Sequence, residues 1–142
     1  MNIEDAIRSR SSIRAFTDRP VSSETVTRIL DMAQRAPSGT NTQPWNVHVA
    51  AGPVRDAITA EAYAMFQRGE TDSYAEHDYY PDIWTDTHRD RRRAVGWGLY
   101  GLLGIEKGDR DASMQQAARN YLLFGAPVGI FVTIERYLAK GS

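Results

Sequence analysis

Residues 36–45 read Ala-Pro-Ser-Gly-Thr-Asn-Thr-Gln-Pro-Trp and separate two segments whose apolar residues recur at different periods. In the preceding segment the apolar residues follow the i, i+3, i+4, i+7 spacing of one helix face: Val26, Ile29, Leu30 and Ala33. This spacing predicts a helix that starts after an N-cap at Ser22 or Ser23 and ends by Pro37. In residues 45–49 apolar and polar side chains alternate, which predicts a strand. The stretch is therefore a helix-to-strand loop.

The loop is built from residues that suit contact with a ligand. Gly39 tolerates positive φ and lets the backbone approach another molecule closely. The amides of Asn41 and Gln43 can hydrogen-bond the polar edge of a heteroaromatic ring, and binding groups often lie on loops that a rigid scaffold holds. A second interpretation stays open, an ordinary connection in which Trp45 fills the core.

Working outward, the proline and glycine positions predict further regular elements. Four more helices are expected: residues 3–9, a segment from Pro53 to near Gly69, residues 97–103 and residues 112–124. One more strand is expected over residues 128–134. The strand run is almost continuously apolar, which is typical of a buried central strand. Residues 69–93 are polar and aromatic without a clear period, and we interpret them as a lid-like surface excursion. The length predicts one domain over residues 1–142.

Composition excludes several classes of protein. The 142 residues hold 17 basic and 18 acidic side chains and no cysteine, so thiol catalysis, iron–sulfur clusters and disulfide frameworks are excluded. No apolar stretch near either end has the length of a membrane span, and the N-terminus lacks a signal segment. We therefore expect a cytoplasmic protein that does not bind membranes. The balanced charge gives no general attraction to nucleic acid.

A basic motif, Arg10-Ser11-Ser12-Ile13-Arg14, lies near the N-terminus. In an extended backbone Arg10, Ser12 and Arg14 would share one face, because successive side chains alternate. Two guanidinium groups around a hydroxyl suit a phosphate at one end and a polar ring edge at the other. The alternative is a solvated basic segment.

The predicted excursion holds aromatic and basic residues. Tyr79, Tyr80 and Trp84 either stack on an aromatic ligand or anchor the excursion. A basic run follows, Arg89, Arg91, Arg92 and Arg93, and it could hold a phosphate, an acidic substrate or nucleic acid, or be a solvated helix face balanced by nearby aspartates. The histidines are too dispersed for a metal site, so no metal is expected.

Taken together, these motifs resemble the nitroreductase-like family of FMN-dependent oxidoreductases. The resemblance rests on Ser-Ile-Arg-Ala-Phe at 12–16, the helix that follows Pro20-Val21, and Ala-Pro-Ser-Gly-x-Asn-x-Gln-Pro-Trp at 36–45. Residues 120–134 also resemble the family's helix-then-central-strand passage. The resemblance implies an α+β fold, an α-β-α sandwich around a mainly antiparallel sheet that is incomplete in this chain.

The resemblance assigns the cofactor-binding roles to the basic motif. Arg10, Ser11, Ser12 and Arg14 would hold FMN, with Arg10 and Ser12 toward its phosphate and ribityl chain and Arg14 toward the pyrimidine edge of the flavin. A fixed cation at that edge favours the reduced, anionic flavin.

The loop has a different implied role. Pro37, Ser38, Gly39 and Asn41 would cover the flavin of the other subunit, since the family builds its sites across a homodimer interface. Gln43 matches the motif without a defined role and is a candidate substrate-binding residue, together with Tyr80 and Trp84 of the excursion.

The implied reaction needs no catalytic side chain, because the chemistry takes place on the flavin. NADH or NADPH gives a hydride to flavin N5, and an electron-poor small molecule such as a nitroaromatic or a quinone then accepts it. A flavin-dependent dehalogenase or a ring-fragmenting enzyme of the same family is the nearest alternative.

Family members usually continue into a further interface helix, a glycine-containing loop and a late basic segment, which this sequence lacks. We therefore expect that a C-terminal portion is absent. A truncated, non-catalytic dimerising module is the alternative from a different class, and binding of nucleic acid through residues 89–93 is the weakest hypothesis.

Overall fold

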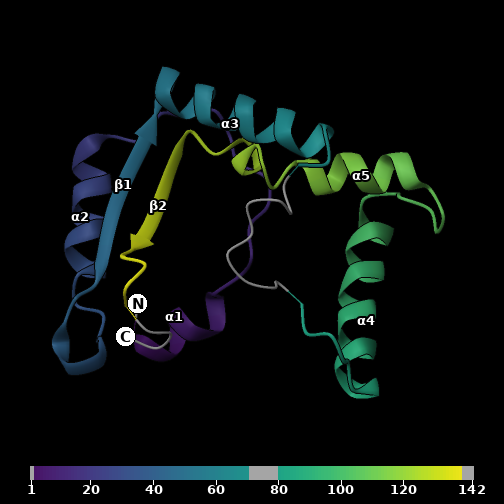
Figure 1. Cartoon of the computed structure of the whole chain (residues 1–142), viewed down its shortest axis with the longest axis horizontal. Helices are drawn as coiled ribbons and strands as arrows, with labels where there is room; N and C mark the ends of the chain where they lie inside the picture. The colour runs from purple at the N-terminus through teal and green to yellow at the C-terminus, as the bar shows by residue number, and fades with distance from the viewer. Residues whose placement is uncertain (1, 71–79, 139–142) are drawn as a thin grey trace. The chain divides into compact units, whose positions relative to one another are not determined.

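The computed structural model describes residues 2–70 and 80–138, which divide into two compact units. The first unit comprises residues 1–58 and 123–142, and the second comprises residues 59–122. Figure 1 shows the helices and strands of both units along the chain.

The first unit is organised around an antiparallel pair of strands, β1 (Trp45–Ala51) and β2 (Val128–Ile134). Trp45 lies opposite Ile134 and Ala51 lies opposite Val128, so all seven residues of each strand are paired. Figure 1 shows the two arrows side by side. Ala50 is 4% exposed and provides the buried apolar contact of this sheet among the described residues.

One face of the two-stranded sheet is apolar. Residues directly opposite each other in an antiparallel pair project to the same side. The cross-strand pairs on this side are Trp45 with Ile134, Val47 with Val132, and Val49 with Ile130. We call these six residues the apolar sheet face; five of them are between 41% and 63% exposed: Val47, Val49, Ile130, Val132 and Ile134.

Two helices precede the strands. Helix α1 (Ile3–Ser9) begins with a capping box between Asn2 and Asp5, and acidic side chains occupy its first turn, where the helix dipole favours negative charge. Helix α2 (Ser23–Ala33) begins at the N-cap Ser22, whose hydroxyl accepts a hydrogen bond from the amide of Thr25. The predicted bounds of both helices are confirmed to within a few residues.

Helix α3 (Gly52–Gln67) follows β1 directly and passes from the first unit into the second. Its predicted start at Pro53 and end near Gly69 are confirmed to within two residues. At its C-terminal end Arg68 donates to Glu70 over 2.8 Å and to Glu61 over 3.2 Å. These hydrogen bonds raise the pKa of Arg68 above its usual value.

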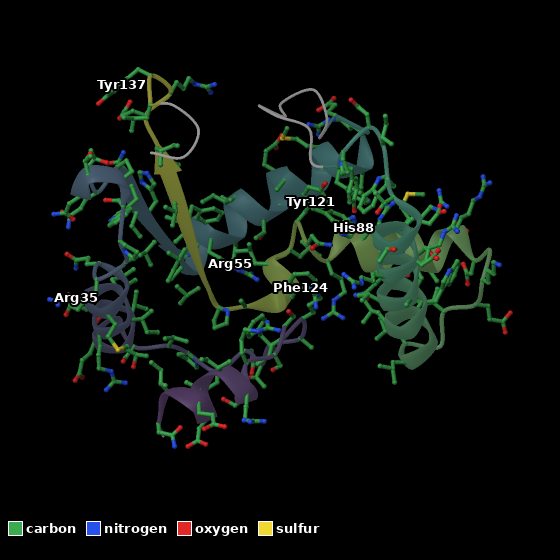
Figure 2. The ribbon with its side chains drawn as sticks, turned by 90° about the horizontal axis from the view of Figure 1, so that it is seen from below. Arg35, Arg55, His88, Tyr121, Phe124 and Tyr137 are labelled. Carbon is green, nitrogen blue, oxygen red and sulfur yellow. The ribbon has the colours of Figure 1, made fainter. Side chains whose placement is uncertain are left out.

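The second unit also contains α4 (Asp86–Leu102) and α5 (Arg110–Ala118). Thr85 caps α4, and Asp109 caps α5 by accepting a hydrogen bond from the amide of Ala112. The rings of Phe66 and Tyr121 stack with centroids 4.7 Å apart (Figure 2 labels Tyr121). The combination of helices with an antiparallel strand pair confirms the α+β class.

Two predicted helix bounds are wrong. Helix α4 starts at Asp86, so residues 86–93 are regular and do not belong to an irregular excursion. The helix expected over residues 112–124 ends at Ala118, and turns lead to the short helix η3 (Leu123–Gly125). After Ala118 the backbone continues in tighter i, i+3 turns, and the helix does not resume, because Leu123 and Phe124 adopt φ of 51° and 54°, which a right-handed helix does not accommodate.

The last strand agrees with its predicted bounds, 128–134, but not with its predicted burial. Its side chains are largely exposed or half-buried within this chain, and among the described residues it pairs with β1 alone. Three of its apolar residues, Ile130, Val132 and Ile134, are between 43% and 63% exposed. The prediction of a single domain with a lid at residues 69–93 stays a prediction, and residues 71–79, including Tyr79 and His77, lie outside the described part.

Candidate functional site

The basic motif lies in the extended connection between α1 and α2, outside any helix or strand. The guanidinium of Arg10 donates to the Ser12 hydroxyl over 3.4 Å, and that of Arg14 donates to the Ser12 carbonyl over 3.3 Å. Both arginines therefore contact Ser12, Arg10 at its hydroxyl and Arg14 at its backbone carbonyl, and the common face of the three side chains stays a prediction. All three side chains are exposed, so the guanidinium groups have further N–H donors available to a ligand.

The segment after the motif is tied to the turn before β2. The amide of Phe16 donates to the carbonyl of Phe124 over 3.3 Å. Gly125 lies beside this contact, since a Cβ there would be 3.8 Å from the Phe16 carbonyl oxygen. Phe124, labelled in Figure 2, thus belongs to a turn that fixes the backbone two residues beyond Arg14.

The loop between α2 and β1 contains the short helix η1 (Gly39–Asn41) and has an unusual backbone. Thr40, Asn41 and Gln43 have φ of 49°, 56° and 46°, a region that non-glycine residues rarely adopt. The Ser38 hydroxyl accepts a hydrogen bond from the amide of Gln43 over 2.9 Å and so closes the loop. Such strained conformations persist only where surrounding contacts hold them, and they occur often at ligand sites.

The two predicted cofactor-binding segments belong to the same unit. In the part of the chain that the structure describes, no hydrogen bond or ion pair joins the basic motif to residues 37–43. The structure therefore brings together Arg10, Ser12 and Arg14 as one group and Ser38 with Gln43 as another. Ser11 and Asn41 are exposed, and the roles of all these residues toward a cofactor stay predictions.

The two aromatic candidates of the excursion meet at Arg92 of α4. The guanidinium carbon of Arg92 lies 4.2 Å from the centroid of the Tyr80 ring and 5.3 Å from that of Trp84. The two rings are 5.8 Å apart, centroid to centroid, and tilted by 52°. These are cation–π distances, so the contacts anchor Tyr80 and Trp84 on α4. Stacking of the two rings on a ligand stays a prediction.

A hollow of about 450 Å³ lies along the same face of α4. Its lining combines guanidinium groups with aromatic rings: Arg89, Arg92, Arg93, Trp84, Trp97 and Tyr100. Positions 89, 93, 96 and 100 recur at i, i+4, i+7 and i+11, so they lie on one helix face. The contribution of Tyr100 was missed from the sequence, because α4 was expected to start only at Trp97; continuing the helical spacing back from Tyr100 to Arg89 would have found it.

The histidines have local explanations. His48 Nε2 lies 3.2 Å from the Thr133 hydroxyl across the strand pair, and His88 Nδ1 lies 2.9 Å from the Thr85 hydroxyl at the start of α4 (Figure 2). Within residues 2–70 and 80–138 no group of three metal-ligating side chains occurs. In the same residues no helix is both long enough and apolar enough to span a membrane.

Comparison with known proteins identifies the family. The family model of the nitroreductase family matches residues 7–141, and the chain belongs to this family. The chain is 37% identical over 132 residues to a 4-nitrobenzoate reductase of Nocardioides sp. strain LMS-CY, covering 92% of this chain and 53% of the relative. It is 35% identical to a nitrobenzene nitroreductase of Ectopseudomonas oleovorans, covering 99% of this chain and 62% of the relative.

Solved structures agree with the sequence comparison. The FMN- and NADPH-dependent nitroreductase NfnB from Sphigopyxis sp. strain HMH has a TM-score of 0.88 and 39% identity, covering 99% of this chain and 63% of that protein. The nitroreductase NfnB from Mycobacterium smegmatis, solved with NADPH, has a TM-score of 0.86 and 27% identity, covering 97% and 61%. These likenesses confirm the nitroreductase-like fold. The chain spans between half and two thirds of the length of these relatives.

Proposed function

We propose that this chain is part of an FMN-dependent nitroreductase that uses NADH or NADPH to reduce an electron-poor small molecule such as a nitroaromatic or a quinone. The observation that carries the proposal is the match of 99% of the chain, at a TM-score of 0.88, to a nitroreductase described as dependent on FMN and NADPH. When bound, FMN supplies the redox chemistry by accepting a hydride and passing it on.

The donor set of the basic motif fits the anionic end of FMN. Guanidinium groups match phosphate with several parallel N–H donors, and hydroxyls add further donors. Arg10 and Arg14 already converge on Ser12, over 3.4 Å and 3.3 Å, and their remaining donors are exposed. In this proposal Arg10, Ser11 and Ser12 hold the phosphate and ribityl chain, and Arg14 lies at the pyrimidine edge, where its charge favours the reduced flavin.

In this proposal the residues of the loop between α2 and β1 contribute to the flavin site of a partner subunit and not to that of their own chain. Pro37, Ser38, Gly39 and Asn41 cover the flavin of a partner subunit, and Gln43 contacts the acceptor. The exposure of the apolar sheet face, where Val132 is 63% exposed, is compatible with a homodimer. Either a partner or the further length present in the relatives would cover that face.

The relatives favour nitroaromatics as the acceptor class. They are named for 4-nitrobenzoate and for nitrobenzene, one an anion and the other neutral. None of these names points to a dehalogenase. A cytoplasmic location and the absence of nucleic-acid and membrane binding stay predictions from composition.

The proposal is tested by the visible absorption spectrum of the full-length protein and by quantifying its heat-released FMN. Near-stoichiometric FMN and NAD(P)H-dependent reduction of a nitroarene are expected. Full-length protein that is colourless and fails to take up added FMN would refute the proposal and favour a non-catalytic module.

Arg14→Ala and Arg10→Ala should each weaken FMN binding by roughly tenfold to a hundredfold, because a hydrogen bond to a charged group contributes about 1.5–3 kcal/mol. Arg8→Ala is the matched control. It removes the same charge at the end of α1, two residues before Arg10, where the Arg8 side chain is 77% exposed and pairs with Glu4 over 2.8 Å. FMN affinity should be unchanged in this variant.

A further inference from the structure

Arg92 differs from the neighbouring arginines in how its charge is compensated. Arg89 pairs with Asp86, and Arg93 lies 4.0 Å from Asp90. Across the residues that the structure describes, no carboxylate lies within ion-pair distance of Arg92, whose contacts are the rings of Tyr80 and Trp84. Its positive charge is therefore the least compensated among the three arginines that line the hollow.

The cation–π contacts leave Arg92 able to bind an anion. A guanidinium is planar, and its five N–H donors lie in the plane, so contact of its face with a ring leaves donors at its edge. The two aromatic contacts also restrict the side chain, which lowers the entropy lost when it binds a ligand. A carboxylate accepts two parallel N–H bonds from such an edge.

The rest of the hollow suits a flat aromatic ring. Trp97 and Tyr100 line it, with ring centroids 6.2 Å apart in an edge-to-face arrangement, and half-buried Leu99 adds apolar surface. Its volume of about 450 Å³ is within the range of small-molecule sites. A third cation–π contact joins Lys107 to the ring of Trp97 at 5.6 Å, so one lining ring already contacts a cation.

We propose that the α4 hollow binds aromatic carboxylates, with the carboxylate on Arg92 and the ring against Trp97 and Tyr100. Where the chain acts as the nitroreductase proposed above, this site selects nitroarenes that carry a carboxylate over neutral ones. The identification as an acceptor site rests on that proposed function, whereas binding itself does not. The local charge agrees with a small anion: residues 86–93 hold four arginines and two aspartates, a net charge of 4 − 2 = +2.

The test compares 4-nitrobenzoate with 4-nitrobenzamide, which has nearly the same shape and no charge. Both are titrated into the full-length protein, and the dissociation constants are measured by isothermal titration calorimetry. The wild type should bind the acid at least tenfold more tightly than the amide. Arg92→Gln should lower this preference by about tenfold or more, because a charge-assisted bidentate contact is lost.

Arg91→Gln is the matched control, since Arg91 is exposed on α4 and does not line the hollow. It should keep the wild-type preference for the acid. Arg92→Lys retains the cation but not the bidentate geometry, so an intermediate preference is expected. Circular dichroism verifies that each variant is folded, and if Arg92→Gln does not fold, the Arg92→Lys result decides.

Two results would overturn the proposal. One is equal binding of acid and amide by the wild type. The other is an equal loss of preference in Arg91→Gln and Arg92→Gln, which would show that the preference comes from the overall positive charge of α4 and not from a contact with Arg92. Reduction of 4-nitrobenzamide by NAD(P)H separates the two proposals. Reductase activity without a preference for the acid refutes the site alone, and a preference in binding without reductase activity refutes the proposed function alone.

Discussion

The substitution Gly129→Ala should destabilise the first unit by about 1–3 kcal/mol, the usual cost of adding a methyl group to a filled site. Gly129 pairs with buried Ala50, and a Cβ at this position would lie 2.7 Å from Leu123 Cδ1 and 3.1 Å from Phe131 Cε2. Relief requires the end of the Leu123 side chain to rotate away and the Phe131 ring to shift as well, since Phe131 Cζ would also lie 3.3 Å from the added Cβ. Urea unfolding of the full-length protein, followed by far-UV circular dichroism, measures the change in free energy of unfolding.

Gly98→Ala is the control for this substitution. Gly98 lies within α4, and a Cβ there would meet no atom within 4 Å. The same change should therefore stabilise the protein by about 0.5–1 kcal/mol, since glycine is costly in a helix interior. The double variant Leu123→Ala with Gly129→Ala should recover at least 0.5 kcal/mol relative to the sum of the single effects. Unchanged stability of Gly129→Ala, or strict additivity with Leu123→Ala, would refute the packing argument.

Three further changes test local features of the chain. Ser22→Ala removes the N-cap of α2 and should cost about 1 kcal/mol in urea unfolding, whereas Ser22→Asp should be nearly neutral. Ser38→Ala removes the acceptor for the Gln43 amide, so hydrogen exchange at that amide should accelerate by roughly twofold to tenfold, and an unchanged rate would contradict the observed loop closure. Gly104→Ala places a side chain at φ of 69° and should lower the free energy of unfolding by about 1 kcal/mol; Gly104→Asn should be better tolerated.

Local sequence signals predicted the elements whose ends carry chemical markers. Ser22 before an apolar i, i+3, i+4 pattern predicted α2, and Pro53 predicted the start of α3. The strand at 128–134 agrees residue by residue, because Pro127 and Glu135 bound an unbroken apolar run. In each case the signal, which is an N-cap residue, a proline or a run of apolar residues, lies within a few residues of the helix or strand end that it predicts.

The start of α4 was not predicted, although the structure agrees with one interpretation of Arg89 to Arg93, a solvated helix face balanced by aspartates. Residues 86–93 are entirely polar, so no apolar period exists there, and the helix is supported instead by a Thr85 cap and the i, i+3 pairs of Arg89 with Asp86 and Arg93 with Asp90. The turns after α5 were also not predicted, since the residues with positive φ, Leu123 and Phe124, are apolar, and the turn they form bonds to Phe16, which is distant in sequence.

The candidate site residues also fall into a group that local sequence predicts and a group that depends on how distant segments pack. Arg10 and Arg14 each contact Ser12, two residues away, so the grouping of these three residues could be predicted locally, although Arg14 bonds to the backbone carbonyl and not to the hydroxyl. The contact of Arg92 with Tyr80 and Trp84 depends on how the segment before α4 folds back onto the helix. All three residues were candidates from the sequence, but their mutual contact was not predicted, since aromatic residues at irregular spacing are compatible with either anchoring or ligand binding.

The apolar sheet face links association to cofactor binding in the proposed enzyme. Burying a valine or isoleucine side chain completely contributes about 1.5–3 kcal/mol, so covering the exposed half of each residue adds roughly 1 kcal/mol. Five such residues, between 41% and 63% exposed, give about 5 kcal/mol before the cost of association. β1 starts at Trp45, next to the loop that would cover a partner's flavin. Whatever covers this face therefore also steadies the end of that loop, and by linkage FMN bound beneath the loop should strengthen the association in turn.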